Sequence, residues 1–461
     1  MTAKLAVLVL SAMASCAHAF CPAPLAPTAL GFAVRSGLAC SQRGPRQGIA
    51  IATRRAASTP TMTAAAAAAP SWEQIKDLLG SQPASPAPVA PMLTLYRDNN
   101  GWCPFCERVW VALLVKGIPF DERTLSLQKK PAWYLEKVPT GLVPSIEFVE
   151  SGEVVWESKD ILMRLENDPR FSSYPSLLPV AELTRATMLL DECDLLTKSI
   201  AGILYGSNAT SAELAAKMQG FEDAMTKMEK LLSESSSPFF LDSGFSMVDC
   251  MLVPILERLA VQLPLKTGIV LRDSQRWPHV EGWFVGMETQ IAPYRDRVKG
   301  DVYSWSASFV TILEMFKSTE GVGGNDPILN ARTQANSVLE KQLSTAPATF
   351  DASSRLEAVR KLVSNHAAIV ADATSEAKTQ KSLDRMTADD TSHVDLALRR
   401  TAAALLNSHT HDVSHLQGVS HAEAQALRII ASRLCVPRDM GAPAAAALRA
   451  GLGSVALAAC K

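Results

Sequence analysis

The sequence predicts an α/β domain, then an all-helical domain, then a further all-helical extension. Three observations lead to this prediction. Between residues 92 and 175, short apolar runs of strand type alternate with stretches of helical periodicity, separated by Gly and Pro. From residue 181 to 300 the apolar spacing is helical throughout. Residues 301–461 keep that spacing but hold no aromatic residue after Phe350, which indicates helices packed through Ala and Leu.

The elements of the α/β domain follow from local patterns. Asp98 to Gly101 is a turn signal between the first apolar run and the first helix, and Gly117 and Pro119 are placed to end that helix. The predicted strands cover 92–96, 120–127, 143–148 and 154–156, and the predicted helices cover 109–115, 131–137 and a stretch that opens at Ser158. This order of strands and helices within about 80 residues is the thioredoxin-type arrangement.

The N-terminal region differs in charge from the rest of the chain. The 461 residues include 45 Lys and Arg and 46 Asp and Glu, a net charge of −1 that favours neither a nucleic-acid partner nor a membrane surface. Residues 1–72 nevertheless hold no acid, and their basic residues are Lys4, Arg35, Arg43, Arg46, Arg54 and Arg55. We expect a signal peptide over 1–19 and a transit peptide over 20–70, and the alternative is a secretory signal followed by a spacer. The apolar run near Lys4 is too short to span a bilayer, and no other candidate span is found.

This leader resembles the two-part presequences of algae whose plastids lie inside an endomembrane, which implies the chloroplast stroma as the location. Without the leader, the thiols are scattered over a long chain, which is unlike a secreted disulfide scaffold. They are Cys103, Cys106, Cys193, Cys250, Cys435 and Cys460. Residues 71–91 are expected to form a linker that begins with a short amphipathic helix.

A Cys-x-x-Cys motif lies where the first predicted strand meets the first predicted helix. Cys103 would stand near the helix N-terminus, where unpaired N–H groups and the helix dipole favour an anion and lower a thiol pKa. Pro104 suits the first helical turn. Half of a zinc site is the competing interpretation, but the sequence has no second cysteine pair at ligand spacing. Inert burial of both cysteines is the other alternative.

Several motifs together resemble the cysteine-type glutathione transferases, with the omega and lambda classes and the dehydroascorbate reductases as the nearest matches. The resemblance runs from about residue 91 to 299. It implies a glutathione-binding domain over 92–175 and an all-α transferase domain over 181–300. The motifs are Cys-Pro-Phe-Cys-Glu-Arg-Val-Trp from Cys103, Lys-Gly-Ile-Pro from Lys116, Lys-Pro-Ala-Trp-Tyr from Lys130, Gly-Leu-Val-Pro-Ser from Gly141, and Phe-Ser-Met-Val-Asp from Phe245. In the last motif Ser246 and Asp249 would cap a buried helix, which is a structural role.

The resemblance assigns roles to individual residues. It implies that Cys103 is the catalytic thiolate that forms a mixed disulfide with glutathione. Val143 would precede a cis proline, Pro144, and pair through its backbone with the cysteinyl part of glutathione. Cys106 is either a resolving thiol or a spectator facing the helix interior. Phe105, next to the nucleophile, is assigned to the glutathione site.

The remaining binding residues flank this centre. Glu157 and Ser158 match the pair that holds the γ-glutamyl end of glutathione, with Ser158 at a helix N-cap. Lys130 matches a residue that contacts a glutathione carboxylate. The alternative interpretations are a simple helix-capping acid for Glu157 and a solvated surface charge for Lys130.

The implied function is a glutathione-dependent thiol transferase that reduces glutathione mixed disulfides or dehydroascorbate. Cysteine in place of the serine or tyrosine of other classes favours thiol–disulfide exchange over conjugation. Glutathione is the cosubstrate, the second substrate is a small oxidised or glutathionylated molecule, and no metal is needed. The alternatives are a non-catalytic scaffold with the transferase fold and a protein that binds hydrophobic ligands.

The role of the extension, residues 301–461, is not specified by its sequence. Three capping-box spacings support its helices: Ser354 with Glu357, Ser392 with Asp395, and Ser420 with Glu423. His411 and His415 have the spacing of a metal pair, but their polar surroundings favour solvated histidines. Oligomerisation as a homodimer, docking of a plastid partner and covering of the substrate cleft are all open for this region.

Overall fold

The computed structural model describes residues 69–82, 89–127, 129–206, 210–272, 275–316, 321–374, 390–407, 416 and 418–459. The predicted signal peptide, and the predicted transit peptide up to residue 68, lie outside these residues. The described chain forms two compact units. The first unit runs from residue 89 to Lys341 and also includes Leu434–Ala445. The second contains residues 69–82, Gln342–Arg433 and the chain from Ala446 onward.

The first unit begins with a four-stranded sheet in the order β2-β1-β3-β4. Strands β1 and β2 are parallel, with Leu93 opposite Phe120, and β3 runs antiparallel to both β1 and β4. The predicted order of strands and helices is confirmed. The elements are β1 (Leu93–Asp98), α3 (Pro104–Lys116), β2 (Phe120–Leu125), α4 (Ala132–Lys137), β3 (Ser145–Phe148), β4 (Val154–Trp156) and α5 (Ser158–Asn167).

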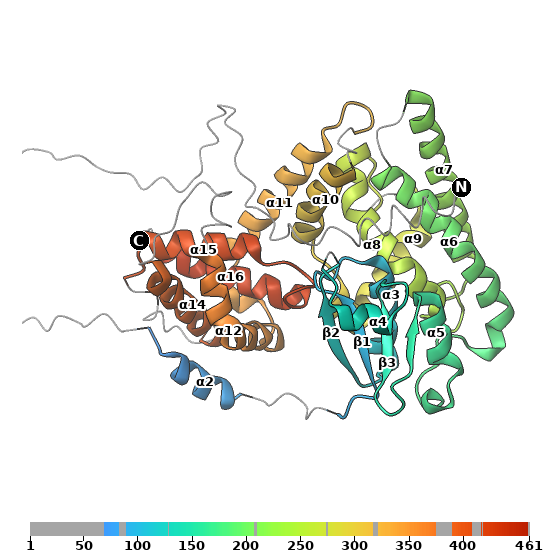
Figure 1. Cartoon of the computed structure of the whole chain (residues 1–461). Coiled ribbons are helices and arrows are strands. Elements are labelled where there is room, and N and C mark those ends of the chain that lie inside the picture. The colour runs from blue at the N-terminus through green and yellow to red at the C-terminus, as the bar shows by residue number, and fades with distance from the viewer. Residues whose placement is uncertain are drawn as a thin grey trace, which may run out of the picture. The chain divides into compact units, whose positions relative to one another are not determined.

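The two faces of the sheet carry two different apolar clusters. Leu93 and Leu95 of β1 join the large core that also takes in α3 and α5, while Tyr96 belongs to a smaller cluster with Tyr134 of α4. Figure 1 shows strands β1, β2 and β3 with helices α3, α4 and α5 beside them. Successive strand residues point to opposite faces, which produces this division. Cys103 lies in the smaller cluster, so the nucleophile candidate is separated from the main core.

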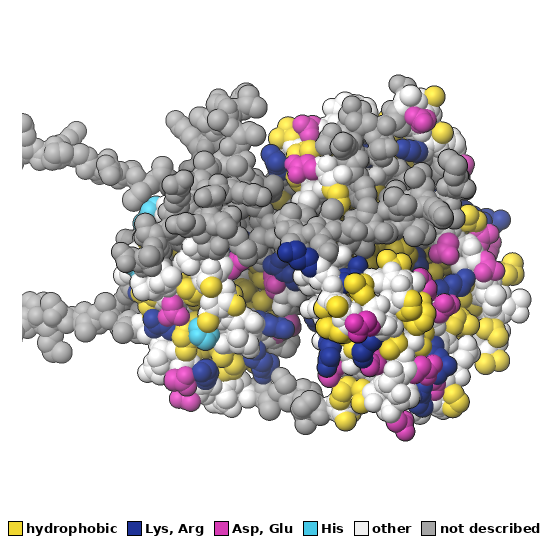
Figure 2. All heavy atoms as spheres, in the orientation of Figure 1, with side chains coloured by type: hydrophobic (Ala, Val, Ile, Leu, Met, Phe, Trp, Pro, Cys, Tyr) yellow, Lys and Arg dark blue, Asp and Glu magenta, His cyan; other side chains and the backbone are white. Residues whose placement is uncertain are grey.

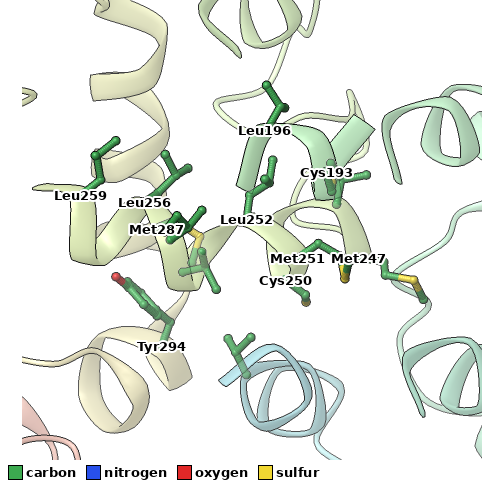
Figure 3. Packing of buried hydrophobic residues seen from close by; sticks show 14 of the residues in the cluster. Cys193, Leu196, Met247, Cys250, Met251, Leu252, Leu256, Leu259, Met287 and Tyr294 are labelled. Atoms are coloured by element: carbon green, nitrogen blue, oxygen red, sulfur yellow. The ribbon is translucent and has the colours of Figure 1, made fainter. Parts of the chain in front are cut away.

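The helical part of the first unit is organised around α8. Its elements are α6 (Leu183–Tyr205), α7 (Ser211–Ser233), α8 (Met247–Thr267), α9 (Pro278–Gln290), the π-helical turn η3 (Tyr294–Val298), α10 (Val302–Phe316) and most of α11 (Pro327–Leu343). Helix α8 is mostly apolar and is buried around almost its whole circumference, as expected for a core helix. Figure 3 shows Leu252 and Leu256 of α8 among side chains of neighbouring elements, including Met287 of α9 and Tyr294 of η3.

The start of α8 has the predicted cap. Ser246 N–H and Oγ both donate to Asp249 Oδ2 at 2.8 Å, and both residues are fully buried. Trp283 of α9 donates its indole N–H to the other carboxylate oxygen at 2.8 Å. Burial raises the pKa of Asp249 to about 6, although these donors stabilise the charged form.

The second unit is helical, and the predicted linker helix is part of it. Its elements are α2 (Trp72–Gly80), α12 (Ala352–Ala373), α14 (Asp390–Leu406), α15 (His421–Arg433) and most of α16 (Ala442–Ala458). Trp72 stacks on His366 at 4.3 Å and donates its indole N–H to Asp395 at 2.7 Å. Arg399 donates to the Pro70 carbonyl at 3.0 Å. The apolar face of α2 is therefore covered by α12 and α14, and residues 71–80 do not act as a linker.

The boundaries of the extension also differ from those predicted. Helix α10, which we placed in the extension from residue 301 onward, belongs with the transferase-type helices because its Phe309 and Leu313 enter their core. The division between units falls inside α11. Helical periodicity is the same on both sides of residue 301, so spacing alone does not locate this boundary.

One of the three predicted capping boxes forms in the extension. Ser420 and Glu423 exchange hydrogen bonds at the start of α15. At α12 the cap is Asp351, which accepts from Ser354 N–H at 2.8 Å, so Ser354 lies inside the helix. Ser392 likewise lies inside α14, which already begins at Asp390. The Ser354 prediction was therefore wrong by about one helical turn, and the Ser392 prediction was wrong because Ser392 is inside its helix.

Charged side chains of both signs are interspersed over the face of the molecule shown in Figure 2. In the parts of the chain that the structure covers, no helix is long and apolar enough to cross a membrane.

Candidate functional site

Cys103 lies at the junction of β1 and α3. It is the N-cap residue of α3, Pro104 opens the helix, and the Cys103 carbonyl accepts the Glu107 N–H at 3.1 Å. Asp98 Oδ2 accepts the N–H of Trp102 at 2.8 Å and so fixes the turn before the cysteine. The turn predicted over Asp98 to Gly101 is therefore present, although no side chain caps the first N–H groups of α3. The thiol therefore stands where the first-turn N–H groups of α3 favour negative charge.

A second loop approaches Cys103 from the start of β3. Cys103 Sγ lies 3.8 Å from the Val143 carbonyl oxygen, and the Val143–Pro144 peptide bond is cis, as predicted. Tyr134 of α4 holds this loop by donating its hydroxyl to the Leu142 carbonyl at 2.5 Å. Burial raises the pKa of Tyr134, so the hydroxyl keeps its proton and remains a donor.

Lys130 lies near this centre. Its Nζ donates to the Leu127 carbonyl at 3.2 Å, and the side chain is half-buried. Burial lowers the pKa of Lys130, and negative charge on Cys103 opposes that shift. The Lys130 ammonium therefore lies within electrostatic range of the Cys103 sulfur.

Glu157 and Ser158 stand at the start of α5, with one change from the prediction. The N-cap is Glu157, and Ser158 is the first residue of the helix. Glu157 is exposed and, among the described residues, is the one non-glycine residue with positive φ, at 67°. Such a conformation is strained for a glutamate. The buried Ser158 hydroxyl has no hydrogen-bond partner in the described chain, so it is available to a ligand.

Phe105 faces the helical domain. Its ring lies under the Arg108 guanidinium at 5.1 Å. Both residues line a small hollow between α3, α6 and α8. The other lining residues are Pro104, Thr197, Tyr205, Met251, Pro254, Ile255 and Arg258. Phe105 also packs against the apolar cluster that contains Cys103, and its role in glutathione binding stays a prediction.

Cys106 is buried one helical turn after Cys103. Only 2% of its surface is exposed. Burial raises the pKa of the Cys106 thiol well above its usual value, and the hydrogen bond to Cys103 raises it further. The Cys106 thiol therefore keeps its proton beside Cys103.

Sequence reasoning missed a buried ionic cluster behind the cysteine. Arg258 of α8 is 1% exposed and donates to Glu107 Oε2 at 2.8 Å and to the Trp102 carbonyl at 2.9 Å. That carbonyl belongs to the peptide unit that leads into Cys103. Glu257 lies on the other side of Arg258 and accepts from Trp305 Nε1 at 2.6 Å. The adjacent charged residues Glu257 and Arg258, in the middle of a mostly apolar helix, are the signal that could have indicated this cluster.

The cluster predicts a pH dependence of stability. Burial raises the pKa of Glu107 from 4.5 to about 8, against the opposing effect of Arg258. A carboxyl group with a raised pKa binds its proton more tightly in the folded chain than in the unfolded chain. This bound proton adds to the free energy of unfolding, and the added stability is lost as the pH rises toward 8. We expect the Tm of the wild-type chain to fall between about pH 6 and 8, and to fall less in Glu107→Gln. Thermal unfolding followed by circular dichroism measures both.

Asp249→Asn is the matched control for this experiment. The pKa of Asp249 in the wild type is also raised, but only to about 6. Asp249→Asn should therefore flatten the dependence of Tm on pH below pH 6 and not above it. Equal slopes for the wild type and Glu107→Gln between pH 6 and 8 would contradict the assignment.

The histidines give no metal site in the described residues. His411 and His415 lie outside them. His366 stacks on Trp72, and His421 contacts Gln425. Within the described ranges no group of three or more His, Cys, Asp or Glu side chains is placed to hold a metal ion.

Comparisons with known proteins agree with this architecture. Residues 102–168 match the family model for the glutathione S-transferase N-terminal domain, and residues 211–285 match the model for the C-terminal domain. Protein IN2-1 of Zea mays is 35% identical over 206 residues, which cover 43% of this chain and 79% of that protein. Glutathione S-transferase L1 of Arabidopsis thaliana is 30% identical over 198 residues, which cover 41% of this chain and 76% of that protein.

Other relatives are matched over a smaller share or with lower identity. Protein IN2-1 homolog A of Oryza sativa is 34% identical, and the match spans 35% of this chain and 63% of that protein. Among solved structures, the dehydroascorbate reductase of Chlamydomonas reinhardtii matches with a TM-score of 0.39 and 24% identity, covering 48% of this chain and 97% of that one. The two family models and the extent of the plant matches lead to one conclusion: the chain belongs to the glutathione S-transferase family.

Proposed function

We propose that this chain is a glutathione-dependent thiol transferase that uses Cys103 to reduce glutathione mixed disulfides or dehydroascorbate. The observation that carries the proposal is the position of Cys103, at the N-cap of α3 and with Sγ 3.8 Å from the Val143 carbonyl. A helix start stabilises negative charge on a sulfur, and the thiolate is the form that attacks disulfides. The location that we propose, the chloroplast stroma, is supported by a relative named glutathione S-transferase L2, chloroplastic.

The proposed reaction has two exchange steps. In the first, the Cys103 thiolate attacks the glutathione sulfur of a mixed disulfide, a Cys103–glutathione disulfide forms, and the substrate leaves as a thiolate that takes up a proton. In the second, the thiolate of a free glutathione attacks that disulfide, which releases oxidised glutathione and restores the Cys103 thiolate. With dehydroascorbate, two glutathiones supply the two electrons and two protons, and the products are ascorbate and oxidised glutathione.

The proposed glutathione site surrounds this centre. The backbone of Val143 beside Pro144 would pair with the cysteinyl part. The unpartnered Ser158 hydroxyl and the N-terminus of α5 would hold the γ-glutamyl carboxylate. The strained backbone of Glu157 supports a binding role, because such strain is concentrated at functional positions. Lys130 would meet the other carboxylate.

A monothiol mechanism follows from the state of Cys106. We expect Cys106→Ser to keep turnover within about threefold of the wild type, because a buried thiol that keeps its proton does not attack a mixed disulfide. Steady-state assays with glutathione and hydroxyethyl disulfide measure this. A loss of activity as severe as that of a Cys103 variant would instead assign Cys106 as a resolving thiol.

The test of the proposed function is the activity of the full chain. Glutathione-dependent reduction of hydroxyethyl disulfide and of dehydroascorbate should both be measured, the first through oxidised glutathione formation and the second through ascorbate absorbance. We expect turnover of at least one of them. If neither is reduced, the enzymatic proposal fails and the scaffold interpretation of the fold takes its place.

A further inference from the structure

The C-terminal extension sends one short segment back into the first unit. Residues 434–441, which we call the return segment, follow α15 and belong to the first unit. All of it is buried except Arg438 and Asp439. It closes a turn on itself, because Asp439 N–H donates to the Cys435 carbonyl at 3.0 Å and Asp439 Oδ2 accepts the Cys435 N–H at 2.8 Å. The return segment is therefore a defined structural element.

The return segment packs directly against the turn that precedes Cys103. A Cβ atom on Gly101, whose φ is +71°, would lie 2.9 Å from Pro437 Cγ, so the proline ring leaves no space for a side chain there. Cys435 and Trp102 line one small hollow beside this contact. Burial raises the pKa of Cys435 to about 11, and a hydrogen bond with the Trp102 side chain opposes that shift.

Two elements of the transferase-type domain hold the return segment in place. The Val436 N–H donates to Ser304 Oγ of α10 at 2.9 Å, in a buried position. Arg297 of η3 donates to the Pro437 carbonyl at 2.9 Å, and its guanidinium also lies over the Trp110 ring of α3 at 4.5 Å. The segment is thus connected both to the turn before Cys103 and to the helix that Cys103 caps.

We propose that the return segment is a positioning element for the loop that carries Cys103. Two groups hold the backbone of this loop: Asp98 accepts the Trp102 N–H, and Arg258 donates to the Trp102 carbonyl. The return segment adds contacts with Gly101 and with the Trp102 indole. A nucleophile is efficient only if the groups around it fix its position to within a fraction of an ångström. The extension then contributes to the reaction without contacting glutathione. This inference rests on the proposed function for its effect on turnover.

The test compares two serines on the same helix. Ser304→Ala removes the acceptor of the Val436 N–H, whereas Ser304→Thr keeps a hydroxyl. Ser306→Ala is the matched control, because Ser306 is fully buried and its Oγ has no hydrogen-bond partner in the described part of the chain. Pro437→Gly removes the ring that contacts Gly101. Amide hydrogen exchange of residues 99–103, read by mass spectrometry, reports the loop independently of activity.

We expect exchange of the loop to be about tenfold faster in Ser304→Ala and in Pro437→Gly than in the wild type, and unchanged in Ser304→Thr and Ser306→Ala. The kcat should fall about tenfold in the first two variants while the KM for glutathione stays near that of the wild type. Unchanged loop exchange in either variant overturns the proposal. Because exchange requires no turnover, an inactive wild type would refute the proposed function and leave this test valid.

Discussion

Replacing Cys103 by serine should abolish glutathione-dependent reductase activity, with a fall in kcat of about a thousandfold or more. The serine hydroxyl fits the space of the thiol beside the Val143 carbonyl, but it cannot form the disulfide through which both steps pass. The KM for glutathione should change little, because the residues proposed to bind it remain. Turnover of hydroxyethyl disulfide and mass spectrometry of the Cys103–glutathione adduct measure the effect.

Cys193→Ser is the matched control for this variant. Cys193 is a fully buried thiol of α6 that donates to the Leu189 carbonyl at 3.2 Å, a contact that serine can keep. This variant should retain the activity and the Tm of the wild type. If Cys103→Ser kept most of the activity while its circular dichroism spectrum was unchanged, Cys103 would not be the nucleophile.

The parts of the fold that could be predicted from the sequence are those that local patterns determine. The junction of a strand, a turn and a helix around Cys103 lies within about ten residues, and the turn signal, the proline at the helix start and the Gly117 stop are all local. Helix starts are predicted less accurately, because neighbouring residues can offer equally good local signals. Asp351 and Ser354 are both good caps, and only the structure shows that Asp351 accepts the first free N–H.

Long-range contacts account for what could not be predicted. Glu107 and Arg258 are 151 positions apart, and nothing in either helix pattern pairs one charge with the other. Pro437 contacts Gly101 from the far end of the chain, in a stretch without a recognisable motif. The amphipathic face of α2 indicates that it needs a partner but does not identify α12 and α14. Sequence patterns identify surfaces that must be buried, and topology selects what covers them.

Replacing Arg258 by glutamine should lower both stability and turnover. It leaves two buried acceptors, Glu107 Oε2 and the Trp102 carbonyl, without their donor, a change that costs about 2–6 kcal/mol in total. A Tm decrease of roughly 5–20 °C follows for a unit of this size. The Trp102 carbonyl also loses its donor, so the Cys103 loop shifts and kcat should fall about a hundredfold, with little change in the KM for glutathione.

Two further variants separate positioning from stability in this experiment. Arg449→Gln removes an equally buried arginine of the second unit, which donates to Gln342 and to the Ala431 carbonyl. It should lower the Tm and leave kcat unchanged. Arg258→Lys keeps the charge beside Glu107 but cannot span to the Trp102 carbonyl as the guanidinium does, so it should recover stability more than turnover. If Arg258→Gln lowers the Tm and its kcat at a temperature where it is fully folded equals that of the wild type, then Arg258 stabilises the fold without positioning Cys103.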